Sequence, residues 1–183
     1  MTEFHDQELL ELFGDESRRN YGFNLLVTKY QRKVYWQVRR IIIDHDDAND
    51  VVQNTFIKVW KGLSGFRQDS NLYTWIYRIA ANESLTFLKQ QKKRMQVSID
   101  DEESNVGDTL KADTHYEGNK MQLKLQEAIA TLPDKQKLVF TMKYFDDLKY
   151  EELSEILGTS VGALKASYHL AVKKIEEFLK KDS

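Results

Sequence analysis

The 183-residue sequence contains no cysteine and only one proline. Without thiols the chain can form no disulfide, no cysteine nucleophile and no thiolate metal site. No apolar run approaches the roughly 20 residues of a transmembrane helix. The N-terminal sequence MTEFHDQELLELFG is acidic, whereas a secretion signal is basic and then apolar. We therefore expect a cytoplasmic protein that does not insert into a membrane.

Glycine is also scarce, with eight residues, and alternating strand-type patterns are few. Hydrophobic residues make up 41 % of the chain and charged residues 31 %, which is typical of a globular protein. The apolar residues recur mainly at helical spacing. These features predict an all-α fold.

Charge is distributed unevenly along the chain, although the formal net charge is only −2. Residues 29–40 and 89–94 are basic, and residues 44–50 are acidic. Segment 98–118 is rich in acids and has no sustained apolar period, which predicts a flexible linker. The sequence thus predicts two small helical domains, residues 1–95 and 119–183, joined by an acidic linker at 96–118. Residues 1–18 form either a short leading helix or a frayed end.

The C-terminal block reads as four helices. Their apolar stripes are Met121, Leu125, Ala128 and Ile129; then Leu138, Val139, Met142 and Phe145; then Tyr150, Leu153, Ile156 and Leu157; then Leu164, Tyr168, Ala171 and Ile175. Pro133 suits the first turn of the second helix, where its missing N–H costs nothing. Gly158 can end the third helix with a positive φ, and Ser160 can cap the fourth.

The last two of these helices have the spacing of a helix-turn-helix. The fourth helix is expected to pack its apolar stripe inward and to present Lys165, Ala166, His169 and Lys173 outward. A slender polar and basic face of this kind fits the DNA major groove. The alternative is an ordinary surface helix, because short helical hairpins containing glycine are common.

Two further helices carry mixed faces. In DANDVVQNTFIKVW (47–60), an inward stripe is predicted for Val52, Phe56, Val59 and Trp60, and Asp50, Gln53, Asn54 and Ile57 share the other side. An isoleucine among an acid and two amides fits a protein partner, although single exposed apolar residues are normal.

Segment FRQDSNLYTWIYRIAANESLTFLKQQKKR (66–94) combines a polar loop with a helix. Ile76, Ala80 and Phe87 share one face of that helix, and Trp75, Arg78, Asn82, Lys89 and Lys93 line another. Aromatic rings stack on unpaired bases and cations follow the phosphate backbone, so the second face favours contact with opened DNA. The loop can hold an extruded base. The alternative is that Trp75 lies in the core and the lysines are simply solvated.

Taken in chain order, these segments resemble a bacterial RNA polymerase sigma factor of the extracytoplasmic-function (ECF) subfamily of the sigma-70 family. The resemblance spans residues 20–180 and includes LPDKQKLVFTMKYFDDLKYEELSEILGTSVGALKASYHLAVKKI. It implies a subunit with sigma regions 2 and 4 that binds core RNA polymerase, recognises promoter DNA and initiates transcription. It further implies no enzymatic activity, no catalytic residues, no cofactor and no metal, and an anti-sigma factor as a partner.

The resemblance also implies roles for individual residues. Asp50, Gln53 and Asn54 would dock on the clamp-helix coiled coil of the polymerase. The −10 element would be melted and read by Phe66, Arg67, Ser70, Asn71, Leu72, Trp75, Tyr77, Arg78 and Asn82, of which the first five form the base-holding loop. The −35 element would be read by Lys165, Ala166, His169 and Lys173. The acidic linker would thread toward the RNA exit channel.

The chain departs from the family pattern in its recognition helix. Many members have arginine where this chain has Ser167, Leu170 and Val172, and many have glutamate in place of Asn54. Fewer cations make fewer phosphate contacts, so the chain alone should bind DNA weakly. We expect core polymerase to supply the remaining affinity.

Two other functions fit the sequence less well, a stand-alone helix-turn-helix regulator and a metal-dependent enzyme. A stand-alone helix-turn-helix regulator would usually dimerise on two half-sites, but no apolar heptad plainly supplies a dimer face. The pairs His5–Asp6 and His45–Asp46 are of the kind found in metal-dependent phosphohydrolases. A metal site needs several converging ligands, whereas the four histidines are scattered, with His115 in the linker and His169 on the recognition helix.

Overall fold

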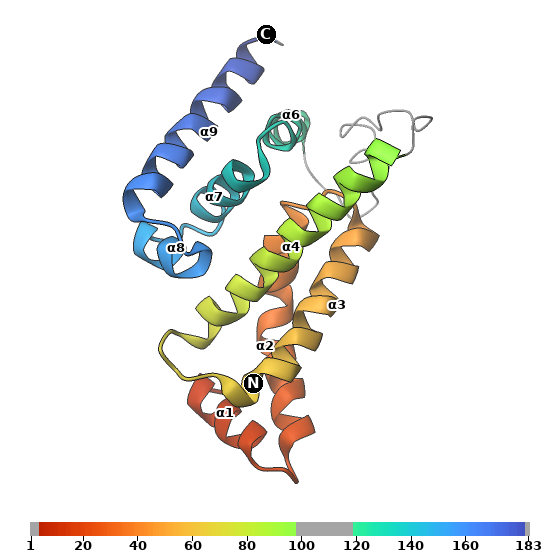
Figure 1. Ribbon diagram of the computed structural model, residues 1–183, viewed down its shortest axis with the longest axis vertical. Helices are drawn as coiled ribbons and strands as arrows, with labels where there is room; N and C mark the ends of the chain where they lie inside the picture. Colours follow the sequence, from red (N-terminus) through yellow and green to blue (C-terminus); the bar gives the residue numbers. More distant parts are fainter. Residues whose placement is uncertain (1–3, 98–118, 182–183) are drawn as a thin grey trace.

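A computed structural model describes residues 4–97 and 119–181, and the predicted linker 96–118 lies almost wholly outside them. No β-strand occurs among the described residues, and the all-α expectation is confirmed. The elements in order are α1 (Asp6–Gly14), α2 (Arg19–Arg39), α3 (His45–Gly62), the short 3-10 helix η1 (Leu63–Gly65), α4 (Leu72–Val97), α6 (Lys120–Ala130), α7 (Asp134–Tyr144), α8 (Tyr150–Leu157) and α9 (Val161–Lys181) (Figure 1).

The N-terminal half is a bundle of α2, α3 and α4, with α1 packed on α2. Of the two alternatives for the N-terminus, the leading helix is correct. Leu9 and Phe13 of α1 are buried in the bundle core. The two helices approach so closely that a Cβ on Gly22 would lie 2.7 Å from the Cβ of Leu12. Glycine at position 22 therefore permits this crossing.

The C-terminal half contains the four predicted helices, and its turn chemistry follows the sequence. Gly158 ends α8 with φ of 62°, the left-handed conformation that glycine adopts without strain. The backbone N–H of Ala163 donates to the Ser160 side-chain oxygen at 3.3 Å, so Ser160 caps α9 as predicted. These two residues set the turn between α8 and α9.

Two details of the C-terminal prediction are wrong. Met121 is 77 % exposed and does not join the buried stripe, because only the end of α6 around Ala128 and Ile129 is covered by α9. Pro133 does not lie in the first turn of α7. It is the cap residue before that turn, with an extended ψ of 144°.

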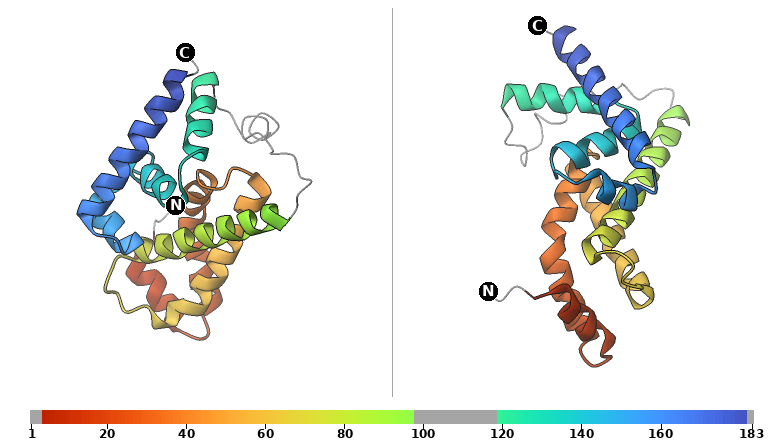
Figure 2. Two further views of the ribbon diagram at one scale, coloured as in Figure 1. Left: turned by 45° about the horizontal axis from the view of Figure 1, so that its top comes forward. Right: turned by 90° about the vertical axis from the view of Figure 1, so that its left-hand side faces the viewer.

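Helix α4 is shared between the two halves. One apolar cluster contains Tyr77 and Leu88 of α4 together with Met142 of α7 and Leu153 of α8. Figures 1 and 2 show α7 and α8 beside α4, on the other side from α3. The halves are therefore packed against each other in one arrangement, with α4 between them.

Candidate nucleic-acid and protein interfaces

The exposed side of α3 begins at a well-capped, acidic N-terminus. Asp44 accepts hydrogen bonds from the backbone N–H groups of Asp46 and Asp47, both at 2.9 Å. Acids in this first turn also interact favourably with the helix dipole. Burial, and after it the neighbouring carboxylates, raises the pKa of Asp47. The start of α3 is thus strongly negative.

The predicted protein-binding residues lie on this side of α3. Asp50, Gln53 and Asn54 are exposed, and the Ile57 side chain is 45 % exposed. Residues on the opposite side, including Val51 and Val59, are buried against the bundle. The helix therefore presents a polar face with one apolar residue, as the sequence predicted.

The inward stripe predicted for α3 is only partly correct. Phe56 and Val59 are buried, whereas Trp60 is 36 % exposed. The Trp60 ring makes edge-on contacts with Phe13 at 5.3 Å and Phe23 at 4.9 Å between ring centroids. Trp60 therefore lies at the rim of the core, where Phe13 of α1 and Phe23 of α2 pack against its ring.

The loop before α4 is anchored by aromatic packing. Phe66 and Trp75 are both half-buried, and their ring centroids are 5.2 Å apart. Leu72 is buried in the bundle core, at the first position of α4. Arg67 and Asn71 are exposed, and Ser70 is half-buried. The loop thus has a rigid base and polar groups at its surface.

The residues of α4 that were predicted to face DNA differ in their exposure. Asn82, Lys89 and Lys93 are exposed, and Trp75 is half-buried. Tyr77 is buried in the apolar cluster shared with α7 and α8, and burial raises the pKa of its hydroxyl. On the other face, Ile76 and Ala80 are fully buried and Phe87 is half-buried.

Helix α9 carries the predicted −35 residues on its outer side. Lys165, Ala166, His169 and Lys173 are all exposed. Leu164, Ala171 and Ile175 are buried, and Tyr168 is half-buried, so the inward stripe is confirmed. Leu170 is 48 % exposed and adds an apolar group beside this face.

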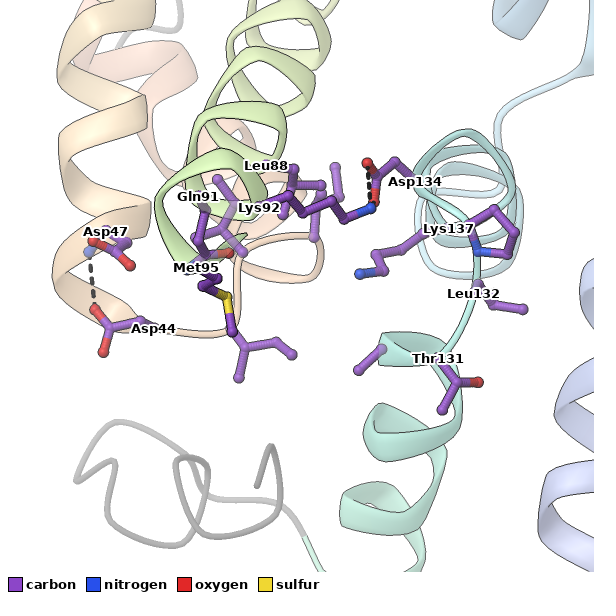
Figure 3. Close-up of a pocket in the computed structure, with 15 residues that line it drawn as sticks. Asp44, Asp47, Leu88, Gln91, Lys92, Met95, Thr131, Leu132, Asp134 and Lys137 are labelled. Carbon is purple, nitrogen blue, oxygen red and sulfur yellow. Dashed lines mark hydrogen bonds and ion pairs between the residues drawn. The ribbon is translucent and has the colours of Figure 1, made fainter. Parts of the chain in front are cut away.

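Sequence reasoning missed the polar contacts that tie the two halves together. Arg40 pairs with Asp146, Tyr73 donates to Glu152, and Arg78 donates to the backbone carbonyl of Glu155. Lys92 of α4 reaches Asp134 of α7, with both N–O distances 2.9 Å (Figure 3). No local pattern signals these pairs, because the partners lie far apart in the sequence.

A pocket of about 630 Å³ lies where α4, the α2–α3 turn, the α6–α7 turn and the start of α7 meet. Leu88, Met95 and the aliphatic residues 41–43 form its apolar lining (Figure 3). Lys137 also lines it and is buried, and burial lowers the pKa of its ammonium group. The pocket belongs to the boundary between the two halves.

His5 and His45 both take part in local structure. His45 bonds the Tyr35 hydroxyl at 2.8 Å and the Asn49 amide at 2.9 Å, and His5 lies at the start of α1. Within residues 4–97 and 119–181, no group of three or more His, Asp or Glu side chains is placed to hold a metal ion. In the same residues, no helix is long and apolar enough to cross a membrane.

Both halves of the chain are similar to known proteins. The family description of Sigma-70 region 2 matches residues 26–94, and that of Sigma-70 region 4 matches residues 122–175. The RNA polymerase sigma-H factor of Pseudomonas aeruginosa is 31 % identical over 98 % of this chain and 96 % of its own length. The ECF RNA polymerase sigma-E factor of Escherichia coli is 35 % identical over 93 % of this chain and 92 % of its own.

Two solved structures share the fold. The sigma factor RpoE of Bartonella quintana, solved with the anti-sigma factor NepR, has a TM-score of 0.69 at 22 % identity and covers 88 % of this chain and 98 % of its own. CnrH, solved with the cytosolic domain of CnrY, has a TM-score of 0.69 at 20 % identity and covers 97 % of this chain and 99 % of its own.

The fold and the exposed faces define a two-part helical DNA-binding protein whose second part is a helix-turn-helix. The chain belongs to the ECF group of the sigma-70 family. As a sigma factor it is a non-enzymatic subunit that binds RNA polymerase and directs it to promoters. The stand-alone regulator considered from the sequence is thereby set aside.

Proposed function

We propose that the exposed face of α3 is the surface that binds core polymerase, with Asp50, Gln53 and Asn54 as its polar contacts. The exposure of all three on one side of a helix whose other side is buried carries this proposal. Ile57 adds an apolar contact in line with them. A single exposed apolar group among amides and an acid suits a partner of mixed polarity.

The second proposed surface is the loop and helix that read the −10 element. Arg67 and Asn71 in the loop, and Asn82 on α4, are exposed and offer donors to an opened strand. The half-buried pair Phe66 and Trp75 offers partly accessible ring faces. The proposed set also includes Ser70, Leu72, Tyr77 and Arg78. Leu72 and Tyr77 are buried, so they support the exposed residues from within the core.

The third proposed surface is the outer side of α9, which reads the −35 element. Lys165, His169 and Lys173 project from one side of this helix, and Ala166 leaves room for the groove wall. The rigid turn at Gly158 and Ser160 fixes α9 relative to α8, as a helix-turn-helix requires.

Several wider features are proposed with these surfaces. We assign residues 1–95 to sigma region 2, 96–118 to an acidic linker and 119–183 to sigma region 4. The protein acts in the cytoplasm, where polymerase and promoter DNA are found. An anti-sigma factor is a proposed partner, because a sigma factor of the same fold was solved with one.

Substitutions on α3 and α4 separate the first two surfaces. Asp50→Arg should weaken binding to core polymerase at least tenfold, since charge reversal in an interface leaves its partner unpaired. Glu176→Arg, at an exposed position of α9, is the matched control. Asn82→Ala should reduce promoter opening with little change in core binding. Unchanged core binding by Asp50→Arg would refute the assignment of the α3 surface. An equal loss of core binding and promoter opening in Asn82→Ala would refute the assignment of the α4 surface.

A further inference from the structure

Leu170 is an exposed apolar residue on the outer side of α9. Its side chain is 48 % exposed, and it belongs to neither apolar cluster of residues 4–97 and 119–181. Val172 and Leu179 of the same helix, by contrast, both pack against the second of these clusters. The position of Leu170 on the surface therefore has no explanation in the packing of the core.

The neighbours of Leu170 on the helix belong to the proposed −35 surface. Ala166 lies four residues before it and Lys173 three residues after it, and both are exposed. Residues at these spacings are neighbours on a helix surface, so Leu170 lies directly beside both. Lys165, which is also exposed, lies further toward the start of the helix. DNA that contacts both lysines therefore meets Leu170 as well.

The charge along α9 shows where this contact ends. Glu176 and Glu177 follow Lys173 by one turn and are exposed, and their carboxylates repel the phosphates of DNA. The part of α9 that can approach DNA thus extends from the start of the helix to Lys173. Leu170 lies within this part and not beyond it.

The chemistry of the major groove limits what Leu170 can recognise there. Every base pair presents hydrogen-bond donors or acceptors in this groove, and only thymine adds an apolar methyl group. A leucine side chain can neither donate nor accept a hydrogen bond. Against any other base it would exclude water from polar groups and leave them unpaired, which is costly.

We propose that Leu170 is a specificity-determining residue, which packs against the 5-methyl group of one thymine in the −35 element. This inference rests on the proposed −35 role of the outer side of α9. The small side chain of Ala166, one turn before Leu170, leaves room for the helix to approach the base edges. Burial of one methyl group is expected to tighten promoter binding about fourfold.

Uracil in place of thymine tests this contact, because the two bases differ only by the 5-methyl group. The probe is the DNA fragment that the holoenzyme, this chain with bacterial core RNA polymerase, enriches most strongly from a random pool. Each thymine of its −35 element is replaced in turn by uracil, and the affinity of the holoenzyme is measured at fixed salt. With the native chain, one replacement should weaken binding about fourfold.

Two variants show whether Leu170 is the residue that senses this methyl group. In holoenzyme with Leu170→Ala, the same uracil replacement should have no effect, because the methyl group has lost its partner. Met121→Ala removes an exposed apolar side chain of α6, outside this surface, and should retain the full uracil effect. An enriched −35 element without thymine, or a uracil effect of equal size in the native and Leu170→Ala proteins, would overturn the inference.

Lysine variants on the same helix show which proposal fails if the uracil effect does not depend on Leu170. Lys165→Ala and Lys173→Ala are measured as holoenzymes on the same fragment. If they weaken binding, the −35 role of α9 stands and only the thymine contact is refuted. If they too leave binding unchanged, the −35 role of α9 is refuted together with the thymine contact.

Discussion

The turn of the helix-turn-helix yields a prediction that compares two glycines four residues apart. Gly158 has φ of 62° and Gly162 lies in the first turn of α9 with an ordinary helical backbone, and a Cβ at either position meets no atom within 4 Å. Steric clashes therefore do not distinguish the two substitutions to alanine. Only the backbone conformation does.

The two substitutions should change the free energy of unfolding in opposite directions. Alanine in the left-handed conformation costs about 1–2 kcal/mol. Alanine also has fewer conformations than glycine in the unfolded chain, and this loss of entropy offsets about 0.4–1 kcal/mol of that cost. Gly158→Ala should therefore lower the free energy of unfolding by about 0.5–1 kcal/mol. Gly162→Ala should raise it by up to about 0.5–1 kcal/mol, because alanine favours helix over glycine.

Thermal unfolding followed by far-ultraviolet circular dichroism measures this difference. A gap of 1–2 kcal/mol corresponds to about 2–8 °C in Tm for a chain of this size. The Gly158→Ala protein should unfold at the lower temperature. Equal Tm values, or a more stable Gly158→Ala protein, would refute the role assigned to the left-handed turn.

Three other predictions concern charge. Lys173→Ala should weaken promoter binding by the holoenzyme and reduce the slope of log affinity against log salt by about 1 if Lys173 contacts a phosphate, and an unchanged slope would exclude that contact. Lys137→Met should raise the free energy of unfolding, measured by urea, by about 1 kcal/mol because it removes a buried ammonium group. The control Lys135→Met, at an exposed position, should change it little, and equal effects of the two substitutions would show that burial of Lys137 is not costly. The hydrogen bond from Tyr73 holds the pKa of Glu152 below its usual 4.5, so the folded state binds fewer protons there. Its stabilising effect is therefore present above pH 4.5 and is lost as the pH falls through the lowered pKa. Glu152→Gln should lessen the fall in free energy of unfolding, measured by urea, as the pH is lowered below 4.5, and an equal fall in both proteins would contradict this role.

Local sequence signals predicted much of the fold and of the proposed surfaces. The period of Leu164, Ala171 and Ile175 identified the inner side of α9, and Gly158 and Ser160 identified the turn before it. Each of these signals depends on neighbours within one or two helical turns. The same reasoning placed Asp50, Gln53 and Asn54 on the solvent side of α3.

The errors and omissions arise where distant segments meet. Periodicity places Trp60 on the inner side of α3, but how much of its ring is covered depends on Phe13 and Phe23 from α1 and α2. The pairing of Arg40 with Asp146 joins residues 106 positions apart. No helical period encodes such a contact. The sequence therefore did not reveal that α7 and α8 pack against α4.

Selection from a pool of random promoter-like DNA fragments, with and without bacterial core RNA polymerase at fixed salt, shows whether promoter recognition by this chain requires the polymerase. We expect specific fragments to be enriched only when core is present, with two separated conserved elements. An Asp50→Arg protein should lose this enrichment. Enrichment of a palindrome by the chain alone would contradict the account, because it would show sequence-specific DNA binding that needs no polymerase.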